Sequence, residues 1–249
     1  MQAIILCGGQ GTRLRSVIGE RQKTMTEVDN EPFLVNVIKY LKRYKITNVI
    51  FATGYKSKEV RDYFGDKYYF GVEVSYAEEK IALGTGGAIR NCLDKIKYDY
   101  VLVLNGDTLF EADLFKLEEN FKTLNADMSI ACKEEADKSR YGSICIDYSG
   151  EKSNGNKEQG VITSFDEKIE SDSNIENVFI NGGIYILKKS LIETIPHGEK
   201  KSLEKDLIPE WLKEGKLIGA TVSKAQFIDI GTPDSLKEFK DRKEEKVDE

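Results

Sequence analysis

Apolar residues along the chain gather into short runs that are separated by polar and glycine-containing segments. Several runs are continuously apolar, as is typical of strands that are covered on both faces of a sheet. The expected strands are residues 3–7, 48–53, 72–76, 100–104, 127–132, 142–148, 178–187 and 226–230. Strands are therefore expected in every part of the chain.

The segments between the early strands show a helical period. Apolar residues recur at helical spacing from Phe33 to Leu41, directly after Pro32, which suits the first turn of a helix. Residues 114–124 repeat this pattern. The alternation of strand and helix predicts a doubly wound α/β fold over the first half, with ligands outside the carboxyl ends of its parallel strands.

The middle and the end of the chain have a different organisation. Residues 142–147 and 160–166 are expected to pair as strands, joined by a polar surface loop over residues 149–157. Residues 237–249 alternate acidic and basic side chains and are expected to form a charged helix end or tail. Since 249 residues can bury one sizeable core, we expect one domain over residues 1–236.

Composition narrows the classes of function. The net charge of -6, with acidic and basic residues interspersed, argues against nucleic acid or a membrane as partner. The apolar run at the N-terminus is too short for a signal or a membrane span, so we expect a soluble, cytoplasmic protein. The four cysteines, Cys7, Cys92, Cys132 and Cys145, form no CxxC pair and are interpreted as reduced thiols. The sole histidine, His197, lies in a polar stretch and is expected on a loop.

The first strand leads directly into a glycine-rich segment that includes Gly8, Gly9 and Gly11. Glycines there let the backbone turn sharply and bring its N–H groups close to an anion. Arg13 and Lys23 follow and favour a polyphosphate as the anion. The forked guanidinium of Arg13 and the single ammonium group of Lys23 would both contact it. The segment is neither a Walker A loop nor GxGxxG, and a glycine turn without a ligand is the alternative.

A second glycine cluster and two aspartates add to this picture. Residues 83–89 are glycine-rich and are expected to be a loop before a helix, whose free N–H groups could receive a phosphate or lie against a base. Asp107 follows one apolar strand, and Asp229 lies near the end of another, just before a glycine turn. Two carboxylates at strand ends, beside phosphate-binding loops, suit Mg²⁺, although capping aspartates at turns would give the same pattern.

Three further stretches carry candidate substrate contacts. Glu167 and Lys168 follow an expected strand, and an exposed charge pair explains them equally well. Asn181 precedes two glycines that interrupt a long apolar strand, which favours a close approach of backbone or ligand. Residues 202–206 combine a cap-like serine with charges, and the start of a helix accounts for them.

Taken in order, these stretches resemble the sugar-1-phosphate nucleotidyltransferase family. The resemblance covers residues 4–236, and its most specific parts are residues 8–14, 83–89, 105–107, 141–142, 167–168, 181–183 and 227–233. It implies a Rossmann-like, three-layer α/β/α fold with a mixed, mostly parallel central sheet. It also implies transfer of a nucleoside monophosphate from a nucleoside triphosphate to a sugar 1-phosphate, with Mg²⁺ as cofactor and pyrophosphate as leaving group.

The resemblance implies a role for each matching residue. The catalytic residues would be Arg13 and Lys23. The nucleotide-binding residues would be Leu6, Gly8, Gly9, Gly11, Thr12, Gly84, Thr85, Asn105 and Gly106. The sugar-phosphate-binding residues would be Gly142, Glu167, Lys168 and Asn181, and the Mg²⁺ ligands would be Asp107 and Asp229. In one departure, this chain has Gln22 and Thr24 where the family usually places prolines on both sides of its lysine, which leaves the orientation of Lys23 open.

The finer resemblance concerns the substrates. Residues 83–89, 179–187 and 202–206 look most like bacterial guanylyltransferases that act on D-glycero-α-D-manno-heptose 1-phosphate and make GDP-heptose for capsule, lipopolysaccharide or S-layer glycans. Nothing in the residue chemistry selects guanine. Thymidylyl, uridylyl or cytidylyl transfer to a hexose 1-phosphate therefore stays open, as does a nucleotide-sugar-binding protein without turnover. Many members of the family form dimers or tetramers, and a homodimer is one expectation here.

Overall fold

The computed structural model describes residues 1–9, 11, 19, 21–28, 30–135, 143–149, 158–166, 178–233, 235–237 and 239. Its strands are β1 (Ala3–Leu6), β2 (Glu27–Val28), β3 (Glu31–Pro32), β4 (Asn48–Thr53), β5 (Tyr68–Tyr69), β6 (Val72–Glu78), β7 (Tyr100–Asn105), β8 (Thr108–Phe110), β9 (Met128–Glu135), β10 (Ser143–Asp147), β11 (Gln159–Asp166), β12 (Val178–Lys188), β13 (Ile218–Ser223) and β14 (Phe227–Asp229). Its α-helices are α2 (Phe33–Arg43), α3 (Ser57–Phe64), α4 (Gly84–Asn91), α5 (Leu114–Leu124), α6 (Lys189–Glu193) and α7 (Ile208–Lys213). Short 3₁₀ turns, η2 (Lys23–Met25) and η3 (Leu93–Lys95), and a π-helical segment, η5 (Leu203–Leu207), complete the described elements.

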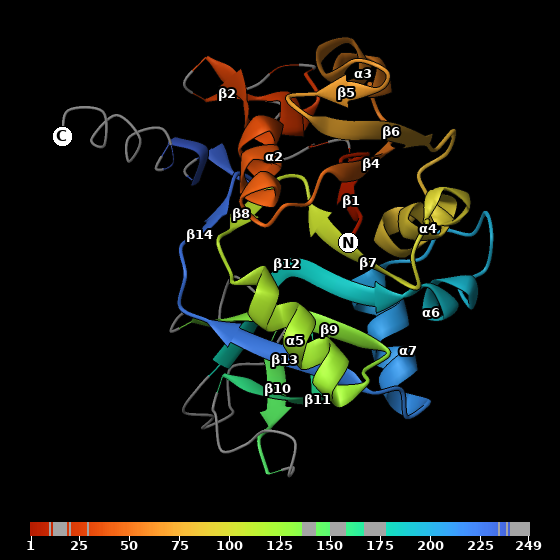
Figure 1. Cartoon of the computed structure of the whole chain (residues 1–249), viewed down its shortest axis with the longest axis vertical. Helices are drawn as coiled ribbons and strands as arrows, with labels where there is room; N and C mark the ends of the chain where they lie inside the picture. The colour runs from red at the N-terminus through yellow and green to blue at the C-terminus, as the bar shows by residue number, and fades with distance from the viewer. Residues whose placement is uncertain are drawn as a thin grey trace, which may run out of the picture.

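A ten-stranded sheet runs through the molecule in the order β10-β11-β13-β9-β12-β7-β1-β4-β6-β5 (Figure 1). The four strands β7, β1, β4 and β6 lie side by side and are parallel. Beyond β7 the described strands pair antiparallel, except for the parallel pair β9 and β13. The mixed α/β sheet is thus confirmed, and the parallel order is concentrated in the N-terminal half, where the strand and helix patterns alternate.

The central strands are covered on both faces, as their continuous apolar runs predict. Side chains alternate between the faces of a strand, so Ala3 and Ile5 join one apolar core while Ile4 joins the other. The first core is closed by α2, α3 and α5, and the second by α4, α6, η5 and α7. The result is the expected three-layer α/β/α arrangement.

Local signals set the bounds of several elements. Helix α5 begins where the Asp113 carboxylate accepts hydrogen bonds from the N–H groups of Phe115 (2.9 Å) and Lys116 (3.3 Å), and it ends at Asn125 with a left-handed φ of 50°. These bounds coincide with the predicted ones. Pro32 lies in β3, immediately before α2, rather than within the first helical turn.

Other expectations have mixed outcomes. The hairpin of β10 and β11 is confirmed, with Ser143 opposite Asp166. Strand β13 and helices α3, α6 and α7 were not predicted. Cys7, Cys92 and Cys132 are buried free thiols as expected, whereas Cys145 is half-buried. Most of the expected charged tail lies outside the described residues. Among the described helices, none is both long enough and apolar enough to cross a membrane.

Candidate active site

A cavity of about 520 Å³ opens at the carboxyl ends of the parallel strands. Its lining includes residues that follow β1, β6 and β7, together with Ala52 within β4 and the start of α4. The chain leaves β1 toward β4 and returns on the other side at β7, so β1 and β7 meet where the winding direction reverses. In open α/β sheets, ligands bind at this switch point. The lining residues are Leu6, Cys7, Gly8, Gly9, Gln22, Lys23, Thr24, Ala52, Glu79, Ala82, Gly84, Thr85, Ala88, Asn105, Asp107 and Lys200.

Neighbouring atoms leave no room for a side chain at two positions of the glycine turn after β1. A Cβ at Gly8 would lie 2.9 Å from Oε1 of Glu79 and 3.3 Å from the backbone nitrogen of Gly54. Gly11 has a φ of +56°, and a Cβ there would lie 2.9 Å from the Cβ of Lys23. The predicted turn therefore holds Glu79 on one side and the lysine turn on the other, with Gly8 and Gly9 lining the cavity.

Lys23 and Asp107 form an ion pair in the cavity. Nζ of Lys23 lies 2.5 Å from Oδ2 of Asp107, and the two side chains are 14% and 33% exposed. Asp107 follows the turn at Gly106, whose N–H donates to the carbonyl of Leu6 at 2.9 Å. The structure thus brings together a predicted catalytic residue and a predicted metal ligand from distant parts of the sequence.

Gln22, which stands where the family usually has a proline before its lysine, holds the turn that leads to Lys23. Its side chain is fully buried; Nε2 donates to the carbonyl of Cys7, and Oε1 accepts from both N–H and Oγ1 of Thr24 at 2.6 Å each. Its φ of -67° is the value that a proline ring imposes. Hydrogen bonds from a glutamine therefore hold the turn before Lys23 and attach it to the end of β1.

A short ladder brings the two predicted metal ligands close together. Strand β14 pairs antiparallel with β8, so Asp229 lies opposite Thr108, the residue after Asp107. The N–H of Ile230 donates to the carbonyl of Asp107 at 3.0 Å. Oδ1 of Asp229 accepts from the N–H of Gly231 at 2.7 Å. Two carboxylates suit Mg²⁺, which completes its shell with substrate phosphates and water; the described residues contain no group of three acidic, histidine or cysteine ligands.

The second glycine cluster is not the free loop that its sequence predicts. Gly84 begins helix α4 with a φ of +71°, and the cluster lies inside that helix. The N–H groups of Gly86 and Gly87 donate to the carbonyl of Lys201, at 2.9 and 3.2 Å, so they are not available to a phosphate. A Cβ at Gly84 would lie 2.5 Å from the same carbonyl. Glycines are needed here because residues 199–203 pass close to the start of the helix. This corrects the prediction of a loop whose free N–H groups could receive a phosphate.

A half-buried chain of hydrogen bonds links Thr85 to Asn181. The Thr85 hydroxyl donates to Oε2 of Glu204 (2.7 Å), and the Tyr185 hydroxyl donates to Oε1 of Glu204 (3.1 Å). The amide of Asn181 donates to the Tyr185 oxygen (2.6 Å), while its Oδ1 accepts from the N–H of Gly183 (2.9 Å). Burial raises the pKa of Tyr185 well above its usual value, which keeps it a neutral donor. Thr85 lines the cavity. Asn181 is connected to Thr85 through Tyr185 and Glu204.

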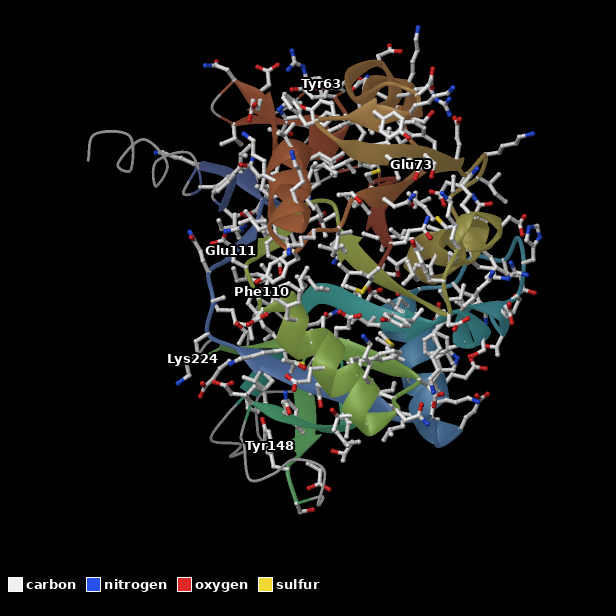
Figure 2. The ribbon with its side chains drawn as sticks, viewed as in Figure 1. Tyr63, Glu73, Phe110, Glu111, Tyr148 and Lys224 are labelled. Atoms are coloured by element: carbon white, nitrogen blue, oxygen red, sulfur yellow. The ribbon has the colours of Figure 1, made fainter. Side chains whose placement is uncertain are left out.

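The glycines after Asn181 make room for two side chains. Phe110, labelled in Figure 2, lies beside β12, and its ring occupies the space that a side chain at Gly182 would need. Nδ2 of Asn105 would lie 2.8 Å from a Cβ at Gly183, where φ is +71°. The close approach predicted from the sequence therefore comes from the protein itself, and it positions Asn105 at the cavity.

Some predicted residues lie outside the described part of the chain, and some cavity residues were not predicted. Thr12, Arg13, Gly142, Glu167 and Lys168 belong to the first group. In the second, Gln22, Glu79 and Lys200 carry polar or charged groups. Glu79 stands in the run Glu-Glu-Lys, which looks like solvated surface. Only its position directly after an apolar strand could have indicated the site.

Comparison with known proteins agrees with this geometry. The profile of the nucleotidyl transferase family matches residues 2–246. A D-glycero-alpha-D-manno-heptose 1-phosphate guanylyltransferase from Aneurinibacillus thermoaerophilus is 38% identical over 237 residues, 95% of this chain and 96% of its own. A protein of the same name from Campylobacter jejuni is 39% identical over 239 residues, 96% of this chain and 98% of its own. The crystal structure of HddC from Yersinia pseudotuberculosis, complexed with GMP-PN, has a TM-score of 0.80 and 34% identity, covering 97% of this chain and 98% of that chain.

Proposed function

The chain belongs to the nucleotidyl transferase family, and from this premise we propose that it transfers GMP from GTP to D-glycero-α-D-manno-heptose 1-phosphate. The products would be GDP-heptose and pyrophosphate. The observation that carries the proposal is the similarity, over 95% of the chain or more, to two guanylyltransferases named for this sugar phosphate. The Lys23–Asp107 pair beside the glycine turn supports the reaction type.

In the proposed reaction, the chain binds and orients two anions. A phosphate oxygen of the sugar phosphate attacks the α-phosphorus of the nucleotide in line, and the bond to the leaving pyrophosphate breaks. The attacking group is already ionised near neutral pH, so no general base is needed. Positioning and neutralisation of charge therefore supply most of the rate.

Each cation would act on a different part of the substrates. Lys23, which its ion pair keeps in the cavity, would neutralise charge at the reacting phosphates. We assign Arg13 to the β- and γ-phosphates, and Lys168 to the sugar phosphate. Gly142, Glu167 and Asn181 would contact the sugar hydroxyls. The backbone of Gly8 and the start of α4 would line the nucleoside.

Asp107 and Asp229 would hold Mg²⁺, because the ladder of β8 and β14 brings them together. When bound, the ion neutralises charge on the triphosphate as pyrophosphate leaves.

The product would serve the synthesis of capsule, lipopolysaccharide or S-layer glycans, and the reaction would take place in the cytoplasm.

Pyrophosphate release tests this function. GTP, CTP, UTP, dTTP and ATP are each offered with the heptose 1-phosphate and with glucose, mannose and galactose 1-phosphates, in the presence of Mg²⁺. Turnover confined to GTP with the heptose supports the proposal. Turnover with another pair retains the reaction and discards these substrates, and nucleotide binding without any turnover favours a non-catalytic protein.

A matched pair of variants tests the role of the lysine. Lys23→Ala should reduce turnover strongly, because it removes a cation from the cavity. Lys39→Ala serves as the control: Lys39 forms a 2.5 Å ion pair with Glu31 on the surface, where its side chain is 61% exposed. Equal effects of the two substitutions would exclude a specific role for Lys23.

A further inference from the structure

Glu59, in helix α3, contacts the turn that carries Lys23. It lies in the first turn of the helix, and its Oε2 accepts a hydrogen bond from the backbone N–H of Gln22 at 2.9 Å. Its other oxygen, Oε1, lies 3.5 Å from Nζ of Lys56. The N-terminal end of a helix favours a negative charge, so Glu59 is suited to accept these contacts as a carboxylate.

The N–H that Glu59 accepts belongs to a fully buried residue, Gln22. A buried donor without an acceptor is costly. If the carboxylate were removed, the turn would have to move until water could reach this N–H. Lys23 is the next residue in the chain, so the movement would be passed on to its side chain.

Both residues next to Lys23 carry a backbone N–H, which a proline lacks. A proline ring fixes φ without needing an acceptor, whereas each of these N–H groups needs one. The N–H of Thr24 donates to Oε1 of Gln22 at 2.6 Å, and the N–H of Gln22 donates to Glu59. The turn therefore supplies one of the two acceptors itself and obtains the other from α3.

The segment that leads into α3 contacts the glycine turn as well. It follows β4, and the N–H of Tyr55 in this segment donates to the carbonyl of Gly8 at 3.2 Å. The side chain of Gln22 reaches the end of β1 through the carbonyl of Cys7. The connection from β4 to α3 thus holds both turns that line the cavity, one through Tyr55 and the other through Glu59.

We propose that Glu59 is a positioning residue, which binds the N–H of Gln22 and thereby keeps Nζ of Lys23 directed at the reacting phosphates. This inference rests on the proposed function. A displaced lysine would still attract the anionic substrates, but it would no longer neutralise the charge that develops in the transition state. Loss of Glu59 should therefore act on kcat more than on KM for the nucleotide.

Pyrophosphate release by Glu59→Ala and Glu59→Gln tests the proposal. We expect Glu59→Ala to lower kcat about tenfold or more and to change KM for the nucleotide by less than about threefold. Glu59→Gln keeps an oxygen that can accept from the same N–H, so it should retain about half of the native kcat or more. Ser57→Ala is the control, because Ser57 lies in the same turn of α3 but donates to Oε1 of Glu78 at 2.5 Å; its kcat should match that of the native protein.

Labelling of amines measures the position of Lys23 without turnover. Its Nζ lies 2.5 Å from Oδ2 of Asp107 and its side chain is 14% exposed, which protects it from acetic anhydride. In Glu59→Ala, peptide mass spectrometry should show that Lys23 is acetylated about tenfold faster. Lys39, which is 61% exposed, is the internal reference, and its rate should not change.

A double-variant cycle tests the route through the N–H of Gln22. Gln22→Pro removes this N–H, so the further substitution Glu59→Ala should lower kcat by less than about twofold in that variant. Losses of kcat that simply add would show that Glu59 does not act through Gln22, and would overturn the proposal.

The remaining outcomes separate this inference from the proposed function. Native kcat and native labelling of Lys23 in Glu59→Ala overturn the role of Glu59 and keep the proposed function. A loss of kcat in Glu59→Gln or Ser57→Ala equal to that in Glu59→Ala also overturns the role, because the effect then does not depend on the acceptor.

A native protein without turnover on any substrate pair discards the proposed function, and the labelling rate then decides whether Glu59 positions Lys23. If Glu59→Ala fails to fold, Glu59→Asp decides, because it keeps the charge and withdraws the carboxylate by one methylene group. Native labelling of Lys23 in that variant refutes the inference.

Discussion

Replacing Gln22 by Ala should destabilise the protein and displace Lys23. The substitution removes three hydrogen bonds from a fully buried side chain, to the carbonyl of Cys7 and to N–H and Oγ1 of Thr24. Each bond contributes about 0.5–1.5 kcal/mol net, and the buried N–H of Thr24 loses its partner. We therefore expect the free energy of unfolding to fall by about 2–4 kcal/mol.

Urea unfolding of the native protein, Gln22→Ala, Thr24→Val and the double variant measures this loss. Thr24→Val keeps the shape of the side chain and removes one of the three bonds. A coupling energy of about 0.5–1.5 kcal/mol between the two positions is expected, because they share that bond. A change below about 0.5 kcal/mol for Gln22→Ala would refute the view that these bonds hold the turn.

Kinetics separate positioning from simple destabilisation. If the turn aims Lys23 at the reacting phosphates, Gln22→Ala should lower kcat more than it raises KM for the nucleotide, at a temperature where the variant is folded. Gln22→Pro suits the φ at this position but removes the N–H that donates to Oε2 of Glu59 at 2.9 Å, so it should recover at most part of the lost kcat. A kcat that is unchanged in Gln22→Ala would show that Lys23 is positioned without Gln22.

Three further predictions concern other parts of the site. Asp107→Asn and Asp229→Asn should each abolish most Mg²⁺-dependent pyrophosphate release; full turnover in both variants would exclude these carboxylates as metal ligands. Tyr185→Phe should lower the free energy of unfolding by about 1–3 kcal/mol, because it leaves the half-buried side chains of Asn181 and Glu204 without the hydroxyl; an unchanged urea midpoint would contradict this. Glu79→Gln should raise the Tm, and its advantage should grow as the pH rises above the ordinary carboxyl range and then level off, because burial raises the pKa of Glu79 and so disfavours its charged form in the folded protein; an advantage that shrinks as pH rises would count against the burial of this carboxylate.

Local signals predicted the parts of the site that lie at strand ends. The apolar runs before Gly8 and Asp107 are continuous and end abruptly in turn residues, so their strands and turns were predicted nearly to the residue. Asp113 and Asn125 lie at the two ends of α5, where short-range capping sets its bounds. These features depend on neighbouring residues in the chain.

Features that depend on distant residues were missed. Gly84 to Gly87 lie in a helix, and the carbonyl of Lys201 accepts the N–H groups of Gly86 and Gly87; the glycine run alone carries no sign of that segment. Gln22 replaces a proline through bonds to Cys7, which only the folded structure brings near. Glu79 faces the cavity because Gly8 and Gly54 leave space for it, and no short pattern links these three positions.

The ladder between β8 and β14 also has a consequence for the newly made chain. A ribosome synthesises the glycine turn, Lys23 and Asp107 well before it adds Asp229, and β14 is the strand that places Asp229 opposite Thr108, the residue after Asp107. An emerging chain can therefore form the parallel strands around β1 before the ladder of β8 and β14 exists. Assembly of this ladder is thus delayed until the C-terminal portion of the chain has left the ribosome, and a prematurely terminated product would have the glycine turn, Lys23 and Asp107 without Asp229.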